Sequence, residues 1–476
     1  MPRTPAFDLE SFVRGLDPAT QATLLIELAN EHPLVKQRLV RLHLANDPKR
    51  LAAGFKKTLT AWKRASSFLG YREAREFGIE LETWLGQVER ELMPKDPAAA
   101  VDLAQAFIQS DAVFFNRADD SNGMVGDAVR AGCRLWLQAA ARCESPPHEW
   151  PDKLDALAAG DEYGAREELY RRADLLLGEA ALRALVDRHM AQLATIVAEP
   201  CADGAARTAP VGTYKISATL SLLAQTLRDP DVLVAAVRLY SPTPHATQMQ
   251  GFAQAYIEYG RPADALPWLE PSWGHLNGTR ERLRAQALSQ LGRHAESAAI
   301  LKTVFEERLN VHDLKAWLAE LPPAQQTAAI THARGLAVKH DSPVTAAMLL
   351  VEIGEHELAE AALLAAPQGI RGEDYAPLVP LAKALEAHQC WIGATAVYRA
   401  LLDAILKRAY APAYGHAYRH WQCLEVIAAK GVAWGPLQTH ETYVAEIRRQ
   451  HARKLSFWAY VKGTRGEDPP PPAPQR

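Results

Sequence analysis

The chain has 476 residues, of which 48% are hydrophobic and 23% are charged, as in an ordinary globular protein. This length exceeds what a single hydrophobic core usually holds, so we expect two regions or an extended stack. The formal net charge of -3 argues against a protein dominated by contacts to phosphates, although it leaves room for a local basic face.

The cysteines and the first residues favour a cytoplasmic protein. Five cysteines are present without a Cys-x-x-Cys pair, which favours free thiols in a reducing compartment. They are Cys133, Cys143, Cys201, Cys390 and Cys423. The N-terminal residues contain no apolar signal-peptide core, and no apolar run approaches the roughly 20 residues of a membrane span. We therefore expect a cytoplasmic location and no membrane contact.

The N-terminal region, residues 1–199, is expected to consist of several long helices. One helix is predicted from Pro48 to about Leu69, with Asp47 as its N-cap. A second is predicted over about 72–92, and a third begins at Asp96-Pro97. A further helix is predicted to begin at Asp120-Ser121, where side-chain oxygens can accept the first free N–H groups. Apolar residues three and four apart predict an all-α fold throughout.

Two segments are poor in large apolar residues and rich in residues that break helices. The first, 200–212, is the predicted linker. The second, 463–476, contains the run Pro469-Pro470-Pro471-Pro472 and is expected to form a disordered or polyproline tail.

The region 213–462 carries a recurring helix–turn–helix pattern. In its first copy a small residue, Ala253, precedes the large Tyr256, and the turn glycine Gly260 follows. Ala265 and Leu269 then come in the next helix. This order is similar to the tetratricopeptide pattern, in which small residues let two antiparallel helices touch.

Four further copies follow. Three of them are Ala285, Leu288, Gly292, Ser297 and Leu301; Ala347, Leu350, Gly354, Ala359 and Leu363; and Ala382, Leu385, Gln389, Ala394 and Tyr398. The remaining copy uses Ala316, Ala319 and Ala328 around the turn Pro322-Pro323. The turns near 260, 292, 323, 354 and 389 therefore predict an α-solenoid of antiparallel, degenerate tetratricopeptide-like helix pairs. The alternative is a helical bundle without repeats.

Three segments also resemble a bacterial family of all-helical proteins, domain-of-unknown-function family number 6880. They are residues 114–123 (FFNRADDSNG), 410–418 (YAPAYGHAY) and 447–458 (IRRQHARKLSFW). The chain also looks like the helical regions that follow SWIM zinc fingers, but the Cys-x-Cys and Cys-x-His ligands of that finger are absent. The resemblance implies an all-helical fold and brings neither an activity nor catalytic residues.

The sharpest charge pattern lies on the helix after Pro48. Basic pairs recur every seven residues and form one stripe on a helix: Lys49, Arg50, Lys56, Lys57, Lys63 and Arg64. Leu51, Phe55, Leu59, Trp62 and Leu69 are predicted on roughly the opposite face. The stripe is either a face for an anionic partner such as nucleic acid or, as we favour, the solvated side of an amphipathic helix. No aromatic residue interleaves with the cations, which weakens the case for base stacking.

Other clusters favour structural roles over chemistry. The basic cluster at Arg448, Arg449, His451, Arg453 and Lys454 is interpreted as the polar cap of the stack. Metal ligands could come from His388, Cys390, His416, His420 and Cys423, but paired ligands around a loop are missing, so we expect no metal site. The stripe of Tyr414, Tyr418 and Trp421 is interpreted as core. Arg117, Asp119, Asp120 and Ser121 are interpreted as a helix N-cap with an Arg–Asp pair.

These patterns leave three functional hypotheses. The first is a non-enzymatic scaffold that binds a protein or peptide along the helical stack without a cofactor. The second is a nucleic-acid-associated protein that uses the basic stripe. The third is an enzyme with an unfamiliar helical active site around Asp119, Asp120 and His189. Phosphate loops, dinucleotide fingerprints and hydrolase motifs are absent from the sequence, so we favour the scaffold.

Overall fold

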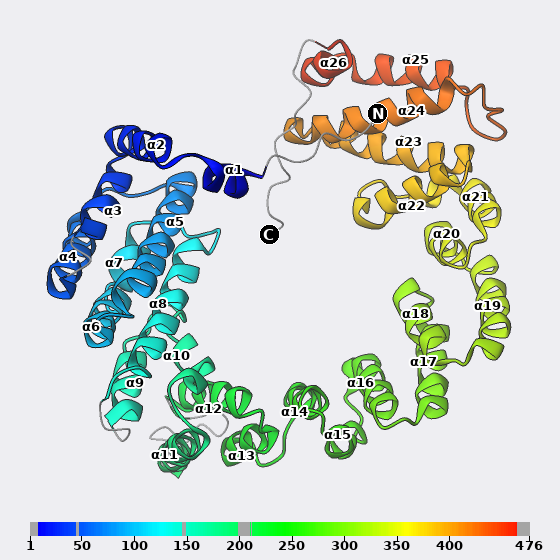
Figure 1. Ribbon diagram of the computed structural model, residues 1–476. Coiled ribbons are helices and arrows are strands. Elements are labelled where there is room, and N and C mark those ends of the chain that lie inside the picture. The colour runs from blue at the N-terminus through cyan, green and yellow to red at the C-terminus, as the bar shows by residue number, and fades with distance from the viewer. Residues whose placement is uncertain (1–7, 44–46, 145–148, 199–209, 211, 464–476) are drawn as a thin grey trace. The chain divides into compact units, whose positions relative to one another are not determined.

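The computed structural model describes residues 8–43, 47–144, 149–198, 210 and 212–463. The chain divides into two compact units, residues 1–248 and 249–476. The described residues are mostly helical, and the β-bridge among them is a single pair, Leu69 with Ala118. The predicted all-α fold is therefore confirmed (Figure 1). Cys201, most of the predicted linker 200–212 and nearly all of the predicted tail 463–476 lie outside the described residues.

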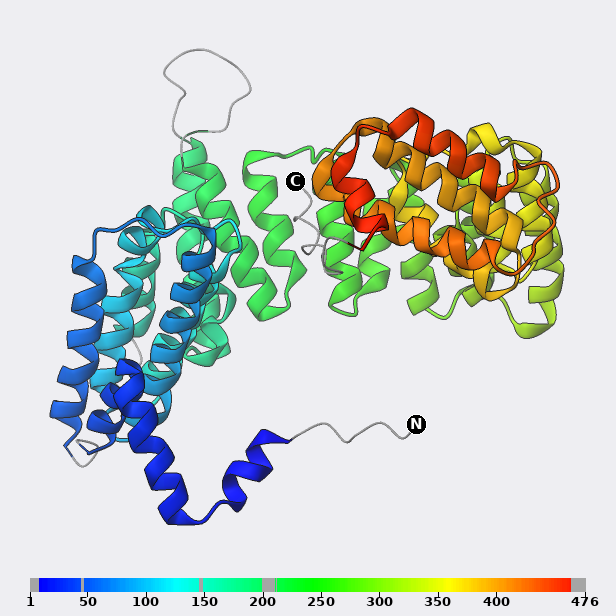
Figure 2. The same ribbon diagram turned by 90° about the horizontal axis from the view of Figure 1, so that it is seen from above.

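The first unit is a layered assembly of helices (Figures 1 and 2). Its helices are α1 Leu9–Gly15, α2 Pro18–Glu31, α3 Pro33–His43, α4 Pro48–Arg64, α5 Tyr71–Gln87, α6 Pro97–Ile108, α7 Asp111–Asn116, α8 Met124–Ala140, α9 Trp150–Ala159, α10 Glu168–Arg171, α11 Glu179–Ala198, α12 Thr213–Leu227 and α13 Pro230–Tyr240. A π-helix, η1 Val88–Leu92, extends α5, and a 3-10 turn, η3 Ala173–Leu175, follows α10. Helix α8 packs against α5, α6, α7 and α10, whereas α1 and α2 bury no residue. The helices that flank the predicted linker, α11 and α12, pack against each other.

Aromatic side chains fill the core where α4, α5, α6 and α7 meet. Trp84 stacks on Phe107 with ring centroids 5.5 Å apart, and Phe55 meets Trp84 edge to face at 5.8 Å. Phe114 closes the cluster from α7, 5.3 Å from the Phe107 ring. Such pairs add about 1 kcal/mol each beyond the area that they bury. The aromatic cluster explains why the apolar face of α4 packs into the core.

Helix α4 is shorter than the sequence predicts. It ends at Arg64, and Ala65 has an extended backbone with φ -70° and ψ 128°. The chain then pairs with a distant segment, because Leu69 N–H donates to Arg117 O at 2.7 Å and Asp119 N–H donates to Leu69 O at 2.9 Å. The prediction of a helix to Leu69 was therefore wrong, since a tertiary β-bridge competes with the last helical turn.

The second unit is an α-solenoid of consecutive helix pairs. Its helices are α14 Ala246–Glu258, which spans the division between the units, α15 Pro262–Leu269, α16 Asn277–Gln290, α17 His294–Arg308, α18 Val311–Glu320, α19 Pro323–Val338, α20 Pro343–Glu352, α21 His356–Ala365, α22 Tyr375–Ala387, α23 Trp391–Arg408, α24 Tyr414–Ala428, α25 His440–His451 and α26 Leu455–Val461. Short 3-10 turns lie at η4 Gly274–Leu276, η5 Pro367–Gly369 and η6 Ala411–Ala413. Each helix packs mainly against its neighbours in the chain, as in α16 with α17 and α22 with α23.

The predicted turn glycines end helices in the same way. Gly260, Gly292 and Gly354 have φ of +76°, +74° and +83°, a left-handed conformation that glycine adopts without steric cost. The N–H of the residue after each glycine donates a hydrogen bond to the carbonyl of the residue four positions before the glycine, as from Arg261 to Tyr256 O at 2.8 Å. This arrangement is the Schellman motif. Gln389 repeats it with φ +63°, so the copy that lacks glycine keeps the same turn.

The small residues of four copies lie where the pattern puts them. Ala253, Ala285, Ala347 and Ala382 are all buried, as are the small residues of the partner helices. The copy around Pro322-Pro323 was predicted wrongly. Ala319 and Ala328 are exposed there, and Ala329, Ala333 and Ala337 are buried instead. The turn was located correctly, but the apolar stripe of α19 lies one residue further along than the pattern suggested.

Candidate functional site

The six cations of the predicted basic stripe lie on one exposed face of α4. Lys49, Arg50, Lys56, Lys57, Lys63 and Arg64 are all exposed, whereas Leu51, Phe55, Leu59 and Trp62 are buried. Arg50 forms an ion pair with the N-cap Asp47, with 3.3 Å between Nε and Oδ2. The predicted orientation of this helix is therefore confirmed, and whether the stripe binds a partner stays a prediction.

The acidic residues before α8 organise a turn. Asp120 accepts hydrogen bonds from the N–H groups of Val125 and Gly126 at 2.8 and 3.0 Å, and so caps a helix that begins at Met124 rather than at Asp120-Ser121. Asp119 accepts from the Ser121 N–H at 3.2 Å. The predicted Arg–Asp pair was wrong, because Arg117 donates to the Trp62 carbonyl at 2.9 Å and covers the Phe77 ring at 4.7 Å.

His189 belongs to a different cluster from Asp119 and Asp120. Its Nε2 lies 3.2 Å from Asp155 Oδ1, and its Nδ1 lies 3.1 Å from Gln192 Oε1. Asp155 also accepts from the Tyr170 hydroxyl at 2.9 Å and from Arg188 at 3.0 Å. Burial raises the pKa of Asp155, but these hydrogen bonds outweigh it and hold the pKa below its ordinary value. Both ring nitrogens of His189 have hydrogen-bond partners, and the cluster links α9, α10 and α11. Asp119, Asp120 and His189, the residues of the enzyme hypothesis, therefore do not lie in one site.

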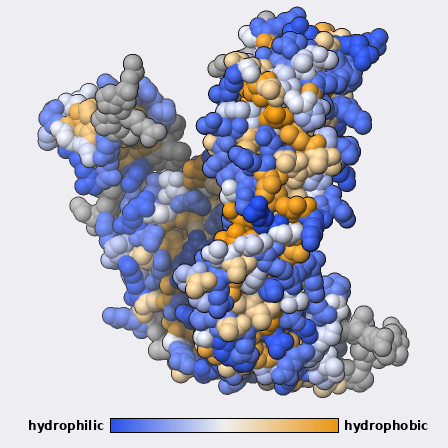
Figure 3. Space-filling model, turned by 90° about the vertical axis from the view of Figure 1, so that its right-hand side faces the viewer, coloured by the Kyte–Doolittle hydropathy of each residue, from blue (hydrophilic) through white to orange (hydrophobic). Residues whose placement is uncertain are grey.

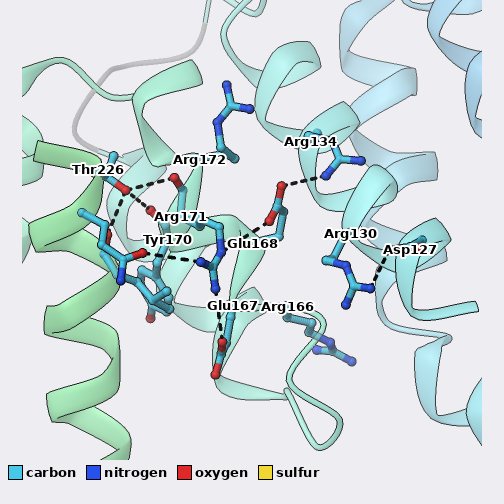
Figure 4. A network of polar contacts seen from close by, with 12 residues as sticks. Asp127, Arg130, Arg134, Arg166, Glu167, Glu168, Tyr170, Arg171, Arg172 and Thr226 are labelled. Atoms are coloured by element: carbon cyan, nitrogen blue, oxygen red, sulfur yellow. Dashed lines mark hydrogen bonds and ion pairs between the residues drawn. The ribbon is translucent and has the colours of Figure 1, made fainter. Parts of the chain in front are cut away.

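A neighbouring polar network links α8, α10 and α12 (Figure 4). Arg134 donates to the buried Glu168 at 2.7 Å, and Arg171 approaches the other carboxylate oxygen at 3.7 Å. Thr226 donates to the carbonyls of Tyr170 and Arg171 at 2.8 and 3.0 Å. The charged groups form ion pairs with one another, an arrangement that is typical of a structural link between helices.

The predicted metal-ligand candidates do not converge in the described part of the chain, which contains no group of three or more histidine, cysteine or acidic residues able to hold a metal ion. His388 stacks on His356 with centroids 3.5 Å apart, and His420 packs on Tyr398 at 5.8 Å. His416 contacts Arg419 at 3.0 Å. The four described cysteines are free thiols. Tyr414 and Trp421 are buried against Phe457, as the core interpretation predicted.

A solvent-open pocket of about 550 Å³, called the α23 cavity below, lies beside α23 in the second unit. One wall is the connector between α21 and α22, and the other is the α23 face that carries Ala396, Ala400 and Ala404. Gly372 brings the connector against α23, since a Cβ atom at this position would overlap the carbonyl oxygen of Ala400. Small residues on both sides thus shape the cavity, and its volume lies within the range of small-ligand sites.

Charged side chains line this cavity: Arg371, Glu373, Arg399, Asp403 and Lys407. Arg371, Glu373, Asp403 and Lys407 are exposed, whereas Arg399 is only 7% exposed. The buried guanidinium lies over the Tyr443 ring at 4.4 Å and the Trp434 ring at 5.4 Å. Its Nη1 donates to the Gln438 carbonyl at 3.0 Å, but Nε and Nη2 have no hydrogen-bond partner and are shielded from solvent. Burial of a charge without a direct ion pair is costly and lowers the pKa of Arg399.

Asp403 lies one helical turn after Arg399 and accepts a 2.6 Å hydrogen bond from the Tyr443 hydroxyl. The carboxylate opens to the cavity, yet the surrounding protein desolvates it and raises its pKa, against the opposing effects of Tyr443 and Arg399. Burial and the neighbouring Asp403 raise the pKa of Tyr443. The buried guanidinium of Arg399 and the carboxylate of Asp403 therefore lie one helical turn apart on the same wall of the cavity.

None of the predicted sites includes the residues of this cavity. A signal was present, because Arg399 interrupts the run Ala396, Val397, Tyr398, Ala400, Leu401 and Leu402, and a charged residue inside an apolar stripe marks either a buried charge or a site. Asp403 and Tyr443 are far apart in sequence, and periodicity alone could not bring them together.

Comparison with known proteins identifies the family. The model of a family of unknown function, DUF6880, matches residues 12–460. The chain belongs to this family. In searches of curated proteins and of solved structures, nothing matches the chain. Among the described helices, none combines the length and the apolar character that a membrane crossing requires.

Proposed function

We propose that the protein is a non-enzymatic helical-repeat scaffold of the cytoplasm that binds a protein or peptide through its second unit. The observation that carries this proposal is the α23 cavity, which combines a floor of small residues with a charged rim and a buried arginine. Arginine is one of the residue types that dominate the binding energy of interfaces, and Arg371 and Arg399 both line this cavity. The free thiols support the cytoplasmic part of the proposal.

The surface of the solenoid also suits an extended partner. In Figure 3, patches of hydrophobic residues interrupt a largely hydrophilic surface. Several large apolar side chains of the second unit are exposed, among them Val338, Tyr375 and Val426. Helical repeats hold extended peptides on the surface that their consecutive helix pairs form, and exposed apolar side chains of this kind can contribute to such binding.

Site-specific photo-crosslinking tests this proposal. The full chain would carry a photoreactive phenylalanine analogue at position 407, on the cavity rim, or at position 56, on the basic stripe as the matched control. Capture from a lysate of the native host, with and without nuclease, would be read by mass spectrometry. A defined protein crosslinked at 407, insensitive to nuclease and absent at 56, is the expected result. No protein at 407, or one that nuclease removes, would refute the proposal.

The exposed stripe on α4 favours one second candidate, a nucleic-acid-associated protein. Such binding would weaken steeply as salt increases, because each phosphate contact releases counterions. Reversal of Lys56, Lys57, Lys63 and Arg64 to Glu should leave the helical circular dichroism unchanged, since all four side chains are exposed. The same variant should abolish binding of a duplex DNA probe if this candidate is right. Loss of the helical signal would instead show that these side chains support the fold.

A further inference from the structure

Arg399 is a buried cation that forms no ion pair with the part of the chain that the structure describes. Nε and Nη2 have no partner, and no described carboxylate lies within ion-pair distance of the guanidinium. Two aromatic rings cover the group, and its side chain lines the cavity. In such desolvated surroundings a charge acts more strongly on its neighbours than it does in water. An anion inside the cavity would therefore offset part of the cost of burying Arg399.

The balance of charges around the cavity limits which anion fits. Three cations line the cavity, Arg371, Arg399 and Lys407, against the carboxylates of Glu373 and Asp403, which gives a formal excess of one positive charge. A single negative charge matches this excess, whereas a dianion such as phosphate would leave one negative charge uncompensated.

We infer that the α23 cavity is a binding site for a carboxylate group, held by the positive charge of Arg399 with Arg371 and Lys407 at the mouth. Asp403 sets the strength of binding, because its own negative charge weakens the attraction. The apolar floor of Ala396, Ala400 and Ala404 receives the hydrocarbon part that bears the carboxylate. This inference concerns the cavity used by the proposed function, and it rests on that function only where a peptide is the source of the carboxylate.

Ligand-detected NMR on the full chain tests the inference with butyrate, a monoanion at neutral pH, as the probe. Butyramide has nearly the same shape without charge, and inorganic phosphate is the dianionic comparison. The variants are Arg399→Met, which removes the charge, and Asp403→Asn, which removes the opposing one. Arg408→Met, at an exposed position on the same helix outside the cavity lining, is the matched control. Circular dichroism would confirm that each variant is folded.

Butyrate should bind about ten-fold more tightly than butyramide or phosphate, and Arg399→Met should weaken butyrate binding by about ten-fold. Asp403→Asn should strengthen butyrate binding by about three-fold, and Arg408→Met should leave it unchanged. This gain cannot come from damage to the fold, so it keeps the test decisive if Arg399→Met fails to fold. Equal binding of butyrate and butyramide, or weaker binding by Asp403→Asn, would overturn the inference.

A second arm distinguishes the two sources of the carboxylate. A hexapeptide with a free C-terminal carboxylate would be compared with its C-terminal amide, both at the same concentration. Stronger binding of the free acid would identify a peptide end, whereas butyrate binding without a difference between the peptides would identify a small organic acid. Butyrate binding together with no protein crosslinked at position 407 would refute the proposed scaffold function and leave the carboxylate site standing.

Discussion

Gly260 holds a left-handed backbone at the turn between α14 and α15. A Cβ atom at this position would meet nothing within 4 Å, so a substitution is opposed by backbone strain alone. Gly260→Val should lower the free energy of unfolding by about 1–2 kcal/mol, which is the cost of a left-handed conformation for a residue with a side chain. Thermal or urea unfolding followed by circular dichroism would measure it.

Gly335 provides the matched control for this substitution. It lies exposed within α19 and has no left-handed φ, and a Cβ atom there would likewise meet nothing within 4 Å. Gly335→Val should be neutral or slightly stabilising, because valine is a better helix former than glycine. If both variants lost the same stability, the turn geometry of Gly260 would not be the cause.

His420 should make the stability of the second unit depend on pH. It is buried on α24, and burial, with smaller contributions from His416, Arg419 and Lys383, lowers its pKa to about 4. Between pH 6.5 and 4 the unfolded chain binds a proton that the folded chain does not, so stability falls as the pH falls through this window. We expect a loss of about 2 kcal/mol between about pH 7.5 and 5. Urea unfolding at both pH values would measure it.

The variant His420→Gln removes this titration. Its stability at neutral pH should be somewhat lower, because a packed ring is lost, but the dependence on pH over the same window should be flatter than in the parent chain. An unchanged slope would assign the acid sensitivity to other groups.

At the scale of elements, a buried ion pair fixes α7 against the segment after α9. Arg166 donates from Nε and Nη2 to the two carboxylate oxygens of Asp111, both at 2.8 Å, and from Nη1 to the Leu157 carbonyl at 2.9 Å. Both side chains are nearly inaccessible. Asp111→Asn should cost about 3–5 kcal/mol, because it leaves the guanidinium buried without its counter-charge. Chemical unfolding would measure this loss.

The double variant Asp111→Leu with Arg166→Met distinguishes the loss of the ion pair from the cost of leaving one charge buried without a partner. It removes both charges and should be clearly more stable than Asp111→Asn, since replacing a buried pair with apolar groups costs less than breaking it. A double variant as unstable as Asp111→Asn would mean that packing, and not the unpaired charge, causes the loss.

Local signals in the sequence predicted most elements, because caps and turns depend on a few adjacent residues. Asp47 and Asp96 cap the helices that they were expected to begin, and Gly260, Gly292 and Gly354 end helices as expected. The errors lie where distant segments decide the outcome. The pairing of Leu69 with Ala118 shortens α4, and the cavity depends on the approach of Gly372 to Ala400 and on Tyr443 reaching Asp403. No periodicity within one helix encodes such contacts.

At the scale of the whole molecule, most buried hydrophobic residues in the described part of the chain belong to one of two clusters, which run from Leu51 to Ala236 and from Ala285 to Tyr460. Leu385→Ala removes a fully buried side chain from the second cluster and should cost about 2–5 kcal/mol. Because the helices of a stack contact mainly their neighbours, amide exchange should accelerate in α22, α23 and α24 and stay unchanged in α5, α6 and α8. Hydrogen–deuterium exchange with mass spectrometry would measure both regions.

The mirror variant Phe107→Leu, within the first cluster, is the control for this experiment. It should accelerate exchange in α5, α6 and α8 and leave α22 to α24 unchanged. Acceleration of all six helices by either variant would show that the two clusters unfold as one cooperative system.

The packing of each helix mainly against its chain neighbours also bears on how the protein is made. A ribosome releases the chain from its N-terminus, and domains generally fold as units in the order in which they emerge. The first cluster is complete once Ala236 has left the exit tunnel, so its core can close while the second half is still being translated. Each later helix pair then finds its partner surface already formed. Once the first cluster has closed, the apolar surface that awaits a partner is thus confined to the last helix face of the growing stack.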